Sequence, residues 1–168
     1  MVLTINTENL ILRNISNKDI DSLKAILLDR EVSDTYILPD FKSLDEVDSL
    51  AKRIIDISND NNRFLFGVYY KDTLIGFINE VNSDKKTIEL GYVIDPKYKN
   101  HGYATETLKA SSEYLLSHEF SKIICGAFIR NKASIRVMEK AGLKKEKNKE
   151  VIEYHGKSEE IVYYSVPK

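Results

Sequence analysis

A polar segment between two ordered stretches carries the residues best suited to chemistry. It runs from Gly91 through Asp95-Pro96 and Lys99-Asn100-His101-Gly102 to Thr105. An extended stretch precedes it and a helical pattern follows it, so the loop ends where free amides and the helix dipole attract anions. The segment therefore predicts a phosphate site, with an ordinary turn around Gly102 as the alternative. It matches neither the GxxxxGK loop followed by Ser or Thr nor the GxGxxG loop of common nucleotide sites.

Length and composition limit what kind of protein can present this loop. The 168 residues, 42% hydrophobic and 30% charged, suit one globular domain over residues 1–168. The lone cysteine excludes an internal disulfide, and three scattered histidines lack the spacing of a metal site. A net charge of −1 argues against a nucleic-acid partner. The sequence has no apolar stretch of the roughly 20 residues that a membrane span needs, which argues against a membrane partner. Because no signal-like start is present, we expect a cytoplasmic location.

The elements that position the loop follow from hydrophobic periodicity and turn signals. Three antiparallel strands are predicted in the middle of the chain, over residues 63–70, 73–81 and 87–94. A helix from Ala104 to about Phe120 and an apolar strand over residues 122–129 come next, followed by a short helix that Asn131 caps and Gly142 ends.

The two ends of the chain complete the prediction. A strand at Leu10–Leu12, a helix after Ser16, a loop over residues 29–41 and a helix that begins at Ser43 precede the central strands. Two polar-alternating strands near residues 143–151 and 160–166 follow them, with a turn at His155-Gly156. The predicted fold class is α+β, with about seven strands in a largely antiparallel mixed sheet and about four helices.

Three segments resemble the GCN5-related N-acetyltransferase (GNAT) family, in particular its branch that acetylates ribosomal-protein N-termini. Residues 99–104 resemble the family's pyrophosphate loop, Arg/Gln-x-x-Gly-x-Gly/Ala, with Lys99 in place of the first Arg or Gln. Residues 7–13 resemble the branch's opening strand, and residues 131–143 resemble its second cofactor motif. These segments occur in the family's order, and the resemblance extends over nearly the full chain.

The resemblance implies acetyl-CoA as the acetyl donor, without a metal. It implies that the strand around Tyr92 splays from its neighbour and offers backbone amides to the donor, and that Asn131 contacts the pantetheine arm. The cofactor-binding residues that it implies are Tyr92, Val93, Ile94, Lys99, Asn100, His101, Gly102, Tyr103, Ala104, Thr105, Asn131 and Ser134.

Two residues are candidates for proton transfer. Glu89, two residues before Gly91, is the candidate general base at a position where the branch often has glutamate. The alternatives are a solvent-facing strand carboxylate and a carboxylate in a structural ion pair. Ser134 is the candidate general acid, with water as the alternative. Many family members carry a tyrosine where Met138 stands, and a thioether cannot donate a proton.

The acceptor is expected to be cationic. Residues 1–50 hold ten acidic and five basic side chains, and the family's acceptor site lies near its first two helices. Asp34, Tyr36, Asp40 and Phe41 are therefore predicted to bind the acceptor; solvation of a mobile loop is the alternative.

These observations predict an N-acetyltransferase that passes acetyl directly from acetyl-CoA to a primary amine in a ternary complex. The amine is a protein N-terminus or a small molecule, and a homodimer is compatible with the sequence. The alternative function is a degenerate module that binds acyl-CoA without turnover, which the departures at Lys99 and Met138 keep open.

Overall fold

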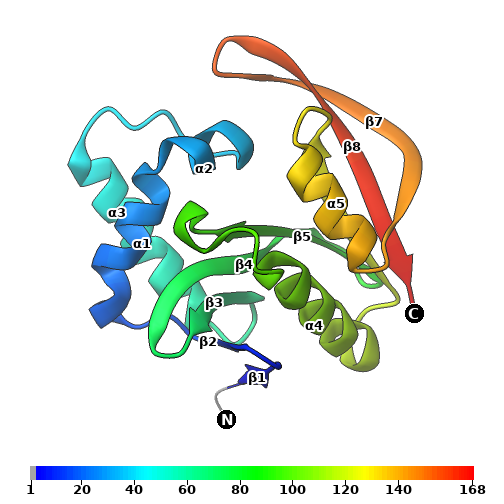
Figure 1. Cartoon of the computed structure of the whole chain (residues 1–168), viewed down its shortest axis with the longest axis horizontal. Coiled ribbons are helices and arrows are strands. Elements are labelled where there is room, and N and C mark those ends of the chain that lie inside the picture. The colour runs from blue at the N-terminus through cyan, green and yellow to red at the C-terminus, as the bar shows by residue number, and fades with distance from the viewer. Residues whose placement is uncertain (1–2) are drawn as a thin grey trace.

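The computed structural model describes residues 3–168 and shows an α+β fold over them (Figure 1). The helices are α1 (Ile20–Leu28), α2 (Arg30–Thr35), α3 (Leu44–Ser58), α4 (Tyr103–His118) and α5 (Lys132–Lys140), with short 3-10 helices at Asn17–Asp19 and Pro96–Tyr98. The strands are β1 (Ile5–Asn6), β2 (Leu10–Arg13), β3 (Leu65–Tyr70), β4 (Thr73–Ser83), β5 (Thr87–Ile94), β6 (Lys122–Phe128), β7 (Lys144–Tyr154) and β8 (Lys157–Pro167). No helix in this part of the chain is long and apolar enough to cross a membrane.

One sheet contains all eight of these strands, in the order β1-β2-β3-β4-β5-β6-β8-β7. Every neighbouring pair is antiparallel except β5 and β6, which run parallel. The parallel pairing covers only Thr87–Glu89 against Lys122–Ile124. Beyond Glu89 the two strands separate, so the edge of β5 that faces β6 is open along the rest of the strand.

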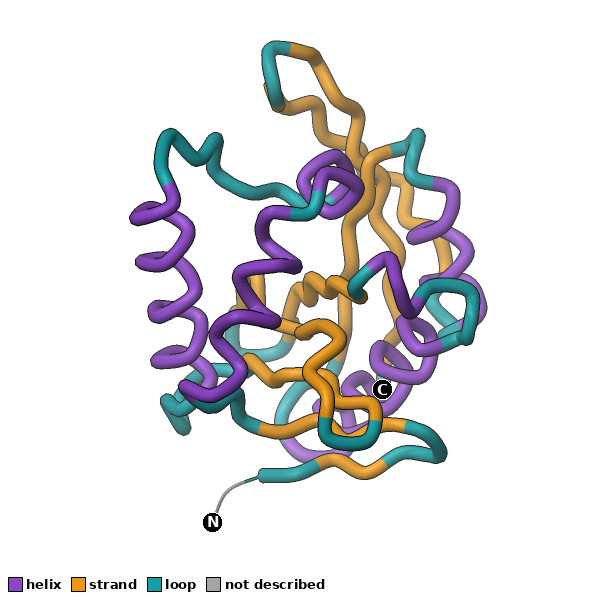
Figure 2. Tube along the Cα trace, turned by 60° about the vertical axis from the view of Figure 1, so that its left-hand side comes forward, coloured by secondary structure: helices purple, strands orange, loops and turns teal. Residues whose placement is uncertain are grey.

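Helices cover both faces of the sheet (Figure 2). Along β3, Phe66 and Val68 point into one apolar core, and Leu65 and Tyr69 point into the other, as the alternation of a strand requires. The first core includes Leu108 of α4, and the second includes residues of α1 and α3. The sheet therefore holds α4 and α5 on one face and α1 and α3 on the opposite face.

Local capping explains where the helices of the first half begin. The Ser43 hydroxyl accepts a hydrogen bond from the Glu46 amide at 3.3 Å, and the Glu46 carboxylate reaches back to the Lys42 amide at 2.8 Å. This confirms the predicted start of the helix at Ser43.

The predicted loop over residues 29–41 is wrong in part, because its first half is helix α2. The Asp29 carboxylate accepts hydrogen bonds from the amides of Glu31 and Val32 at 2.9 and 3.1 Å and so caps a new helix directly after α1. The last two strands are also longer than predicted. Their hairpin reaches α2, where the Tyr154 hydroxyl donates to the Ser33 carbonyl at 2.6 Å (Figure 1).

Candidate active site

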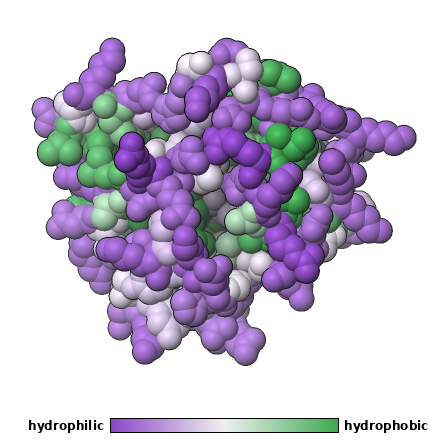
Figure 3. Space-filling view, turned by 45° about the horizontal axis from the view of Figure 1, so that its top comes forward, coloured by the Kyte–Doolittle hydropathy of each residue, from purple (hydrophilic) through white to green (hydrophobic). Residues whose placement is uncertain are grey.

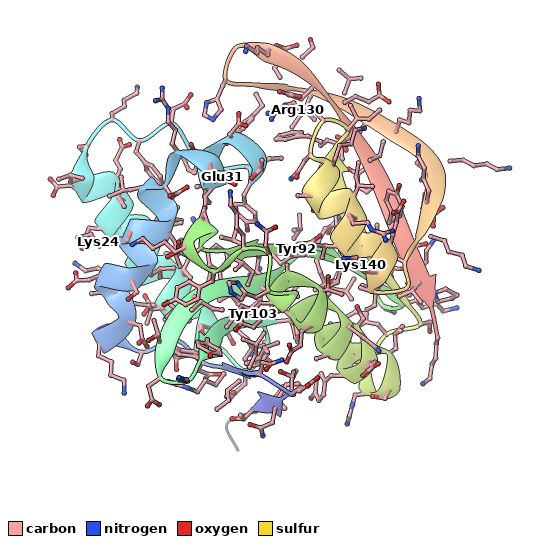
Figure 4. All side chains as sticks on the ribbon, in the orientation of Figure 1. Lys24, Glu31, Tyr92, Tyr103, Arg130 and Lys140 are labelled. Carbon is pink, nitrogen blue, oxygen red and sulfur yellow. The ribbon has the colours of Figure 1, made fainter. Side chains whose placement is uncertain are left out.

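A cleft of about 760 Å³ lies where β5 and β6 separate. Its walls come from α2, β4, β5, the loop after β5, the start of α4, the end of β6 and α5. Tyr92 lies at the centre of the molecule between α2, which carries Glu31, and α5, which carries Lys140 (Figure 4). The space-filling view shows a hollow with pale and green side chains at its floor and polar side chains around it (Figure 3).

The loop at the mouth of the cleft has the geometry that its residues predict. Asn100 and Gly102 both adopt positive φ angles, of 64° and 78°. Gly102 is the N-cap of α4, and the first intrahelical bond runs from the Glu106 amide to its carbonyl at 2.9 Å. The amides of residues 103–105 therefore lack helical partners and line the cleft. A Cβ at Gly102 would meet no atom within 4 Å, so the space directly above this turn is open.

Eleven of the twelve predicted cofactor-binding residues line this cleft, namely Tyr92, Val93, Ile94, Lys99, Asn100, Gly102, Tyr103, Ala104, Thr105, Asn131 and Ser134. His101 is the exception, because its ring turns back onto the loop. Its Nδ1 lies 2.8 Å from the Lys99 carbonyl oxygen, and the ring stacks on Tyr103 with centroids 5.3 Å apart. The prediction that His101 binds the cofactor is thus not supported by its placement.

Positive side chains gather on the walls around this loop. Lys99 lies there as predicted, and its ammonium contacts both Glu31 carboxylate oxygens of α2, at 3.0 and 3.2 Å. Arg136 and Lys140 also line the cleft from α5, and sequence reasoning missed both. Their spacing of four residues on a short helix, which places them on one face, is the signal that could have found them.

Glu89 is the carboxylate that marks the point of separation. It is the last residue of β5 to pair with β6, it lines the cleft, and it is half-buried. Burial raises the pKa of its carboxyl group above the usual range, and the nearby charge of Glu150 on β7 raises it further. Glu89 makes no ion pair with any residue that the structure describes, so the alternative of a structural pair has no support.

Ser134 and Asn131 line the cleft from the start of α5. The Asn131 side chain accepts a hydrogen bond from the Ser134 amide at 3.1 Å, which is a helix cap. The Ser134 hydroxyl lies 2.8 Å from the Tyr92 hydroxyl. Met138, where many family members have tyrosine, is fully buried in the core between α5 and the sheet.

Tyr92 is a functional candidate that sequence reasoning treated only as a source of backbone amides. Its hydroxyl also lies 3.2 Å from the Ser134 carbonyl oxygen, so the phenol is anchored beside the serine. Burial raises the pKa of this phenol, so it keeps its proton at neutral pH. The cleft therefore holds a protonated phenol beside Ser134, whereas the Met138 thioether carries no proton to donate.

The predicted acceptor residues separate in the structure, and three of the four need correction. The Asp34 carboxylate binds Arg130 at 3.1 Å, and the Asp40 carboxylate binds His155 at 2.7 Å, so both face the β7–β8 side of α2. Phe41 packs against the core below α1 and α3. Tyr36 alone lines the cleft, where the carboxylates present are those of Glu31, Glu80 and Glu89.

Comparisons with known proteins agree with this geometry. A family model described as "Acetyltransferase (GNAT) domain" matches residues 9–144. Two relatives from Bacillus subtilis (strain 168) are similar: YoaA, an uncharacterized N-acetyltransferase, is 29% identical over 147 residues, and YnaD, described in the same words, is 32% identical over 146 residues. Each alignment covers 84% of this chain and 83% of the relative.

Solved structures share the fold over nearly all of the chain. An acetyltransferase from Bacillus anthracis superposes with a TM-score of 0.84 at 24% identity, covering 98% of both chains. RimL, a ribosomal L7/L12 alpha-N-protein acetyltransferase in complex with coenzyme A, superposes with a TM-score of 0.82 at 16% identity, again covering 98% of both chains. The chain therefore belongs to the GNAT family of acetyltransferases and is an N-acetyltransferase with the GNAT fold.

Proposed function

We propose that this N-acetyltransferase binds acetyl-CoA in the cleft and transfers the acetyl group directly to a primary amine in a ternary complex. The observation that carries the proposal is that Glu89 and the hydrogen-bonded Tyr92–Ser134 pair line one cleft together with the free amides of the loop. Glu89 is suited to take a proton, and the hydroxyl pair is suited to give one.

The donor would bind at the loop end of the cleft. Free amides at residues 103–105 and the start of the α4 dipole suit a pyrophosphate, and Gly102 leaves room for its close approach. Lys99, Arg136 and Lys140 add positive charge on both sides. RimL, which has the same fold, was solved with coenzyme A bound, and this supports the assignment of the donor.

The reaction needs an amine with a free lone pair and a leaving thiolate that gains a proton. An α-amine has a pKa of about 7.7–8.0, so a carboxylate with a raised pKa suits removal of its proton, directly or through water. The amine nitrogen bonds to the thioester carbon, and the bond from that carbon to sulfur breaks. The thiolate then takes a proton from the Ser134 hydroxyl, and the Tyr92 phenol passes its own proton to Ser134. A water molecule from the open cleft reprotonates the phenol, and the proton that Glu89 took from the amine leaves to solvent, so every group returns to its starting state.

The first prediction concerns turnover. With acetyl-CoA and a panel of amines, we expect thiol release that depends on both substrates and initial rates that fit intersecting lines, as direct transfer requires. The panel contains glycinamide, short peptides with free N-termini, spermidine and an amino sugar, and N-acetylated glycinamide is the control without an acceptor amine. Acetyl-CoA binding without thiol release from any amine would support a binding module instead.

The second prediction isolates the phenol. Tyr92→Phe removes one hydroxyl and leaves the ring packing in place, so we expect kcat to fall about 10-fold or more with little change in the KM for acetyl-CoA. Ser134→Ala lowers kcat as well, and the double variant should be no worse than the poorer single variant, because the two hydroxyls act as one relay. Multiplicative losses in the double variant would contradict the relay.

A further inference from the structure

A second pocket adjoins the part of the cleft that faces away from the loop. It has a volume of about 220 Å³ and lies between the segment at residues 36–39, α3 and the adjoining ends of β3 and β4. The two cavities share four residues of their walls, Tyr36, Ile37, Asn79 and Glu80. The second pocket therefore adjoins the cleft across this shared wall, and we call it the side chamber.

Apolar side chains form most of this chamber. Leu50, Ile54 and Ile57 line it from α3, and Leu65 and Phe77 line it from the sheet, with Phe64 just before β3. Two cations also line it, Arg53 and Arg63, both exposed. Arg63 Nε lies 3.6 Å from a Glu80 carboxylate oxygen, whereas Arg53 has no acidic partner within ion-pair distance among residues 3–168. The chamber thus suits an apolar group and disfavours a second positive charge.

The junction between the two cavities is held in place by Tyr36. Its hydroxyl donates to the Asn79 side-chain oxygen at 2.7 Å, and its ring packs edge-on against Phe77 with centroids 5.6 Å apart. Gly91 lies opposite; a Cβ there would approach Val81 and Tyr36 to 3.1 and 3.4 Å. The missing side chain of Gly91 therefore lets Val81 and Tyr36 lie close to β5 beside the shared wall.

This junction lies close to the proposed base, Glu89. Gly91 is two residues from Glu89 and next to Tyr92 on β5, which corresponds to roughly 7 Å along a strand from the proposed base. An amine held at Glu89 would therefore have its neighbouring atoms at the junction. Two large apolar side chains of the cleft wall, Ile37 and Val81, are each 55% exposed, so the fold does not use them to fill its cores.

We propose that the chamber takes the apolar arm of the acceptor, so that the substrate is a monocationic amine with an apolar group close to its nitrogen. The α-amine of an apolar amino-acid residue has this chemistry. Polyamines and amino sugars do not, because a second ammonium would lose its hydration against the apolar wall and meet Arg53. This inference rests on the proposed function and names the acceptor for that same site.

The test compares kcat/KM for three amides that differ only in the side chain, namely glycinamide, leucinamide and lysinamide. Burial of a leucine side chain predicts that leucinamide exceeds glycinamide about 10- to 100-fold. Lysinamide should not exceed glycinamide, because its second charge opposes entry into the chamber. Equal values for leucinamide and glycinamide overturn the inference and leave the acetyltransferase intact. Acetylation of spermidine or an amino sugar with none of the three amides acetylated also overturns the inference alone, whereas thiol release from no amine of the full panel overturns the proposed function.

Variants locate the preference in the chamber. Leu50→Trp fills it from α3, and we expect the leucinamide-to-glycinamide ratio to fall close to one. Leu44→Trp is the matched control, because Leu44 is 69% exposed on the same helix and lines neither cavity, so the ratio should stay as in the parent. Arg53→Gln at an exposed position, where folding is not at stake, should raise the lysinamide-to-glycinamide ratio several-fold. A parent-like leucinamide-to-glycinamide ratio in a folded Leu50→Trp variant contradicts the assignment. So does an unchanged lysinamide-to-glycinamide ratio in Arg53→Gln.

Discussion

Replacing Gly102 with valine is expected to raise the Kd for acetyl-CoA about 100-fold. The residue has a φ of 78°, which a β-branched side chain opposes, and its missing Cβ leaves the open space where the phosphates would approach the helix amides. Loss of two charge-assisted hydrogen bonds accounts for a change of about this size. Titration calorimetry of the purified variant with acetyl-CoA measures it.

Gly156→Val is the matched control for this substitution. Gly156 has a φ of 72° in the turn between β7 and β8, and a Cβ there also meets no atom within 4 Å, but the residue lies outside the cleft. Both variants should lose thermal stability, and only Gly102→Val should lose affinity. An equal loss of affinity for acetyl-CoA in the two variants would mean that backbone strain, and not blocked access to the loop, causes the loss.

Elements with local signals could be predicted from the sequence. Ser43 with Glu46 marks the start of α3, and Gly102 marks the start of α4; each signal lies within four residues of the backbone group that it satisfies. The loop at residues 99–105 was identified for the same reason. Helix α2 was missed because six residues are too few to show a hydrophobic period, although Asp29 is a good N-cap.

The pairing of charges could not be predicted, because it depends on contacts that are distant in sequence. Asp34 meets Arg130 across 96 positions of the chain, and this ion pair takes a predicted acceptor carboxylate away from the cleft. Tyr92 meets Ser134 across 42 positions, so the phenol beside the serine was not visible in either segment alone. The sequence gives the type of each side chain at these positions, but it does not show which distant side chain each one contacts.

Glu89→Gln is expected to lower kcat about 100-fold or more with little change in the Kd for acetyl-CoA. Glutamine keeps the size of the side chain but cannot take the proton of the amine, and the residue lies away from the loop that would hold the phosphates. The measurement combines steady-state kinetics at saturating substrates with calorimetry of the donor. A parent-like kcat would mean that Glu89 is not the general base.

The raised pKa of Glu89 gives the same variant a second readout. The carboxyl group has a higher pKa in the folded protein than in the unfolded chain, so folding favours its protonated form. Its ionisation therefore costs stability as the pH rises from the unfolded to the folded pKa, and that cost persists above both. Glu89→Gln removes the cost, so we expect a higher Tm than the parent at pH 8 and an equal Tm below pH 4. A lower Tm at pH 8 would show instead that the charged form is stabilised in the fold.

The pH profile of kcat tests whether this shifted carboxyl group is the base. Glu150 raises the pKa of Glu89 by charge repulsion, and its carboxylate accepts a hydrogen bond from the Tyr163 hydroxyl at 2.5 Å, which an amide oxygen can also accept. Glu150→Gln therefore lowers the pKa of Glu89 and should move the acidic limb of the profile to lower pH, with the same amine as acceptor. Glu153→Gln on the same strand removes a carboxylate that has no part in the pKa shift of Glu89. The acidic limb of the kcat profile of this variant should therefore lie at the same pH as in the parent. If both variants shift the limb equally, the group that titrates responds to the overall charge of β7 and is not Glu89.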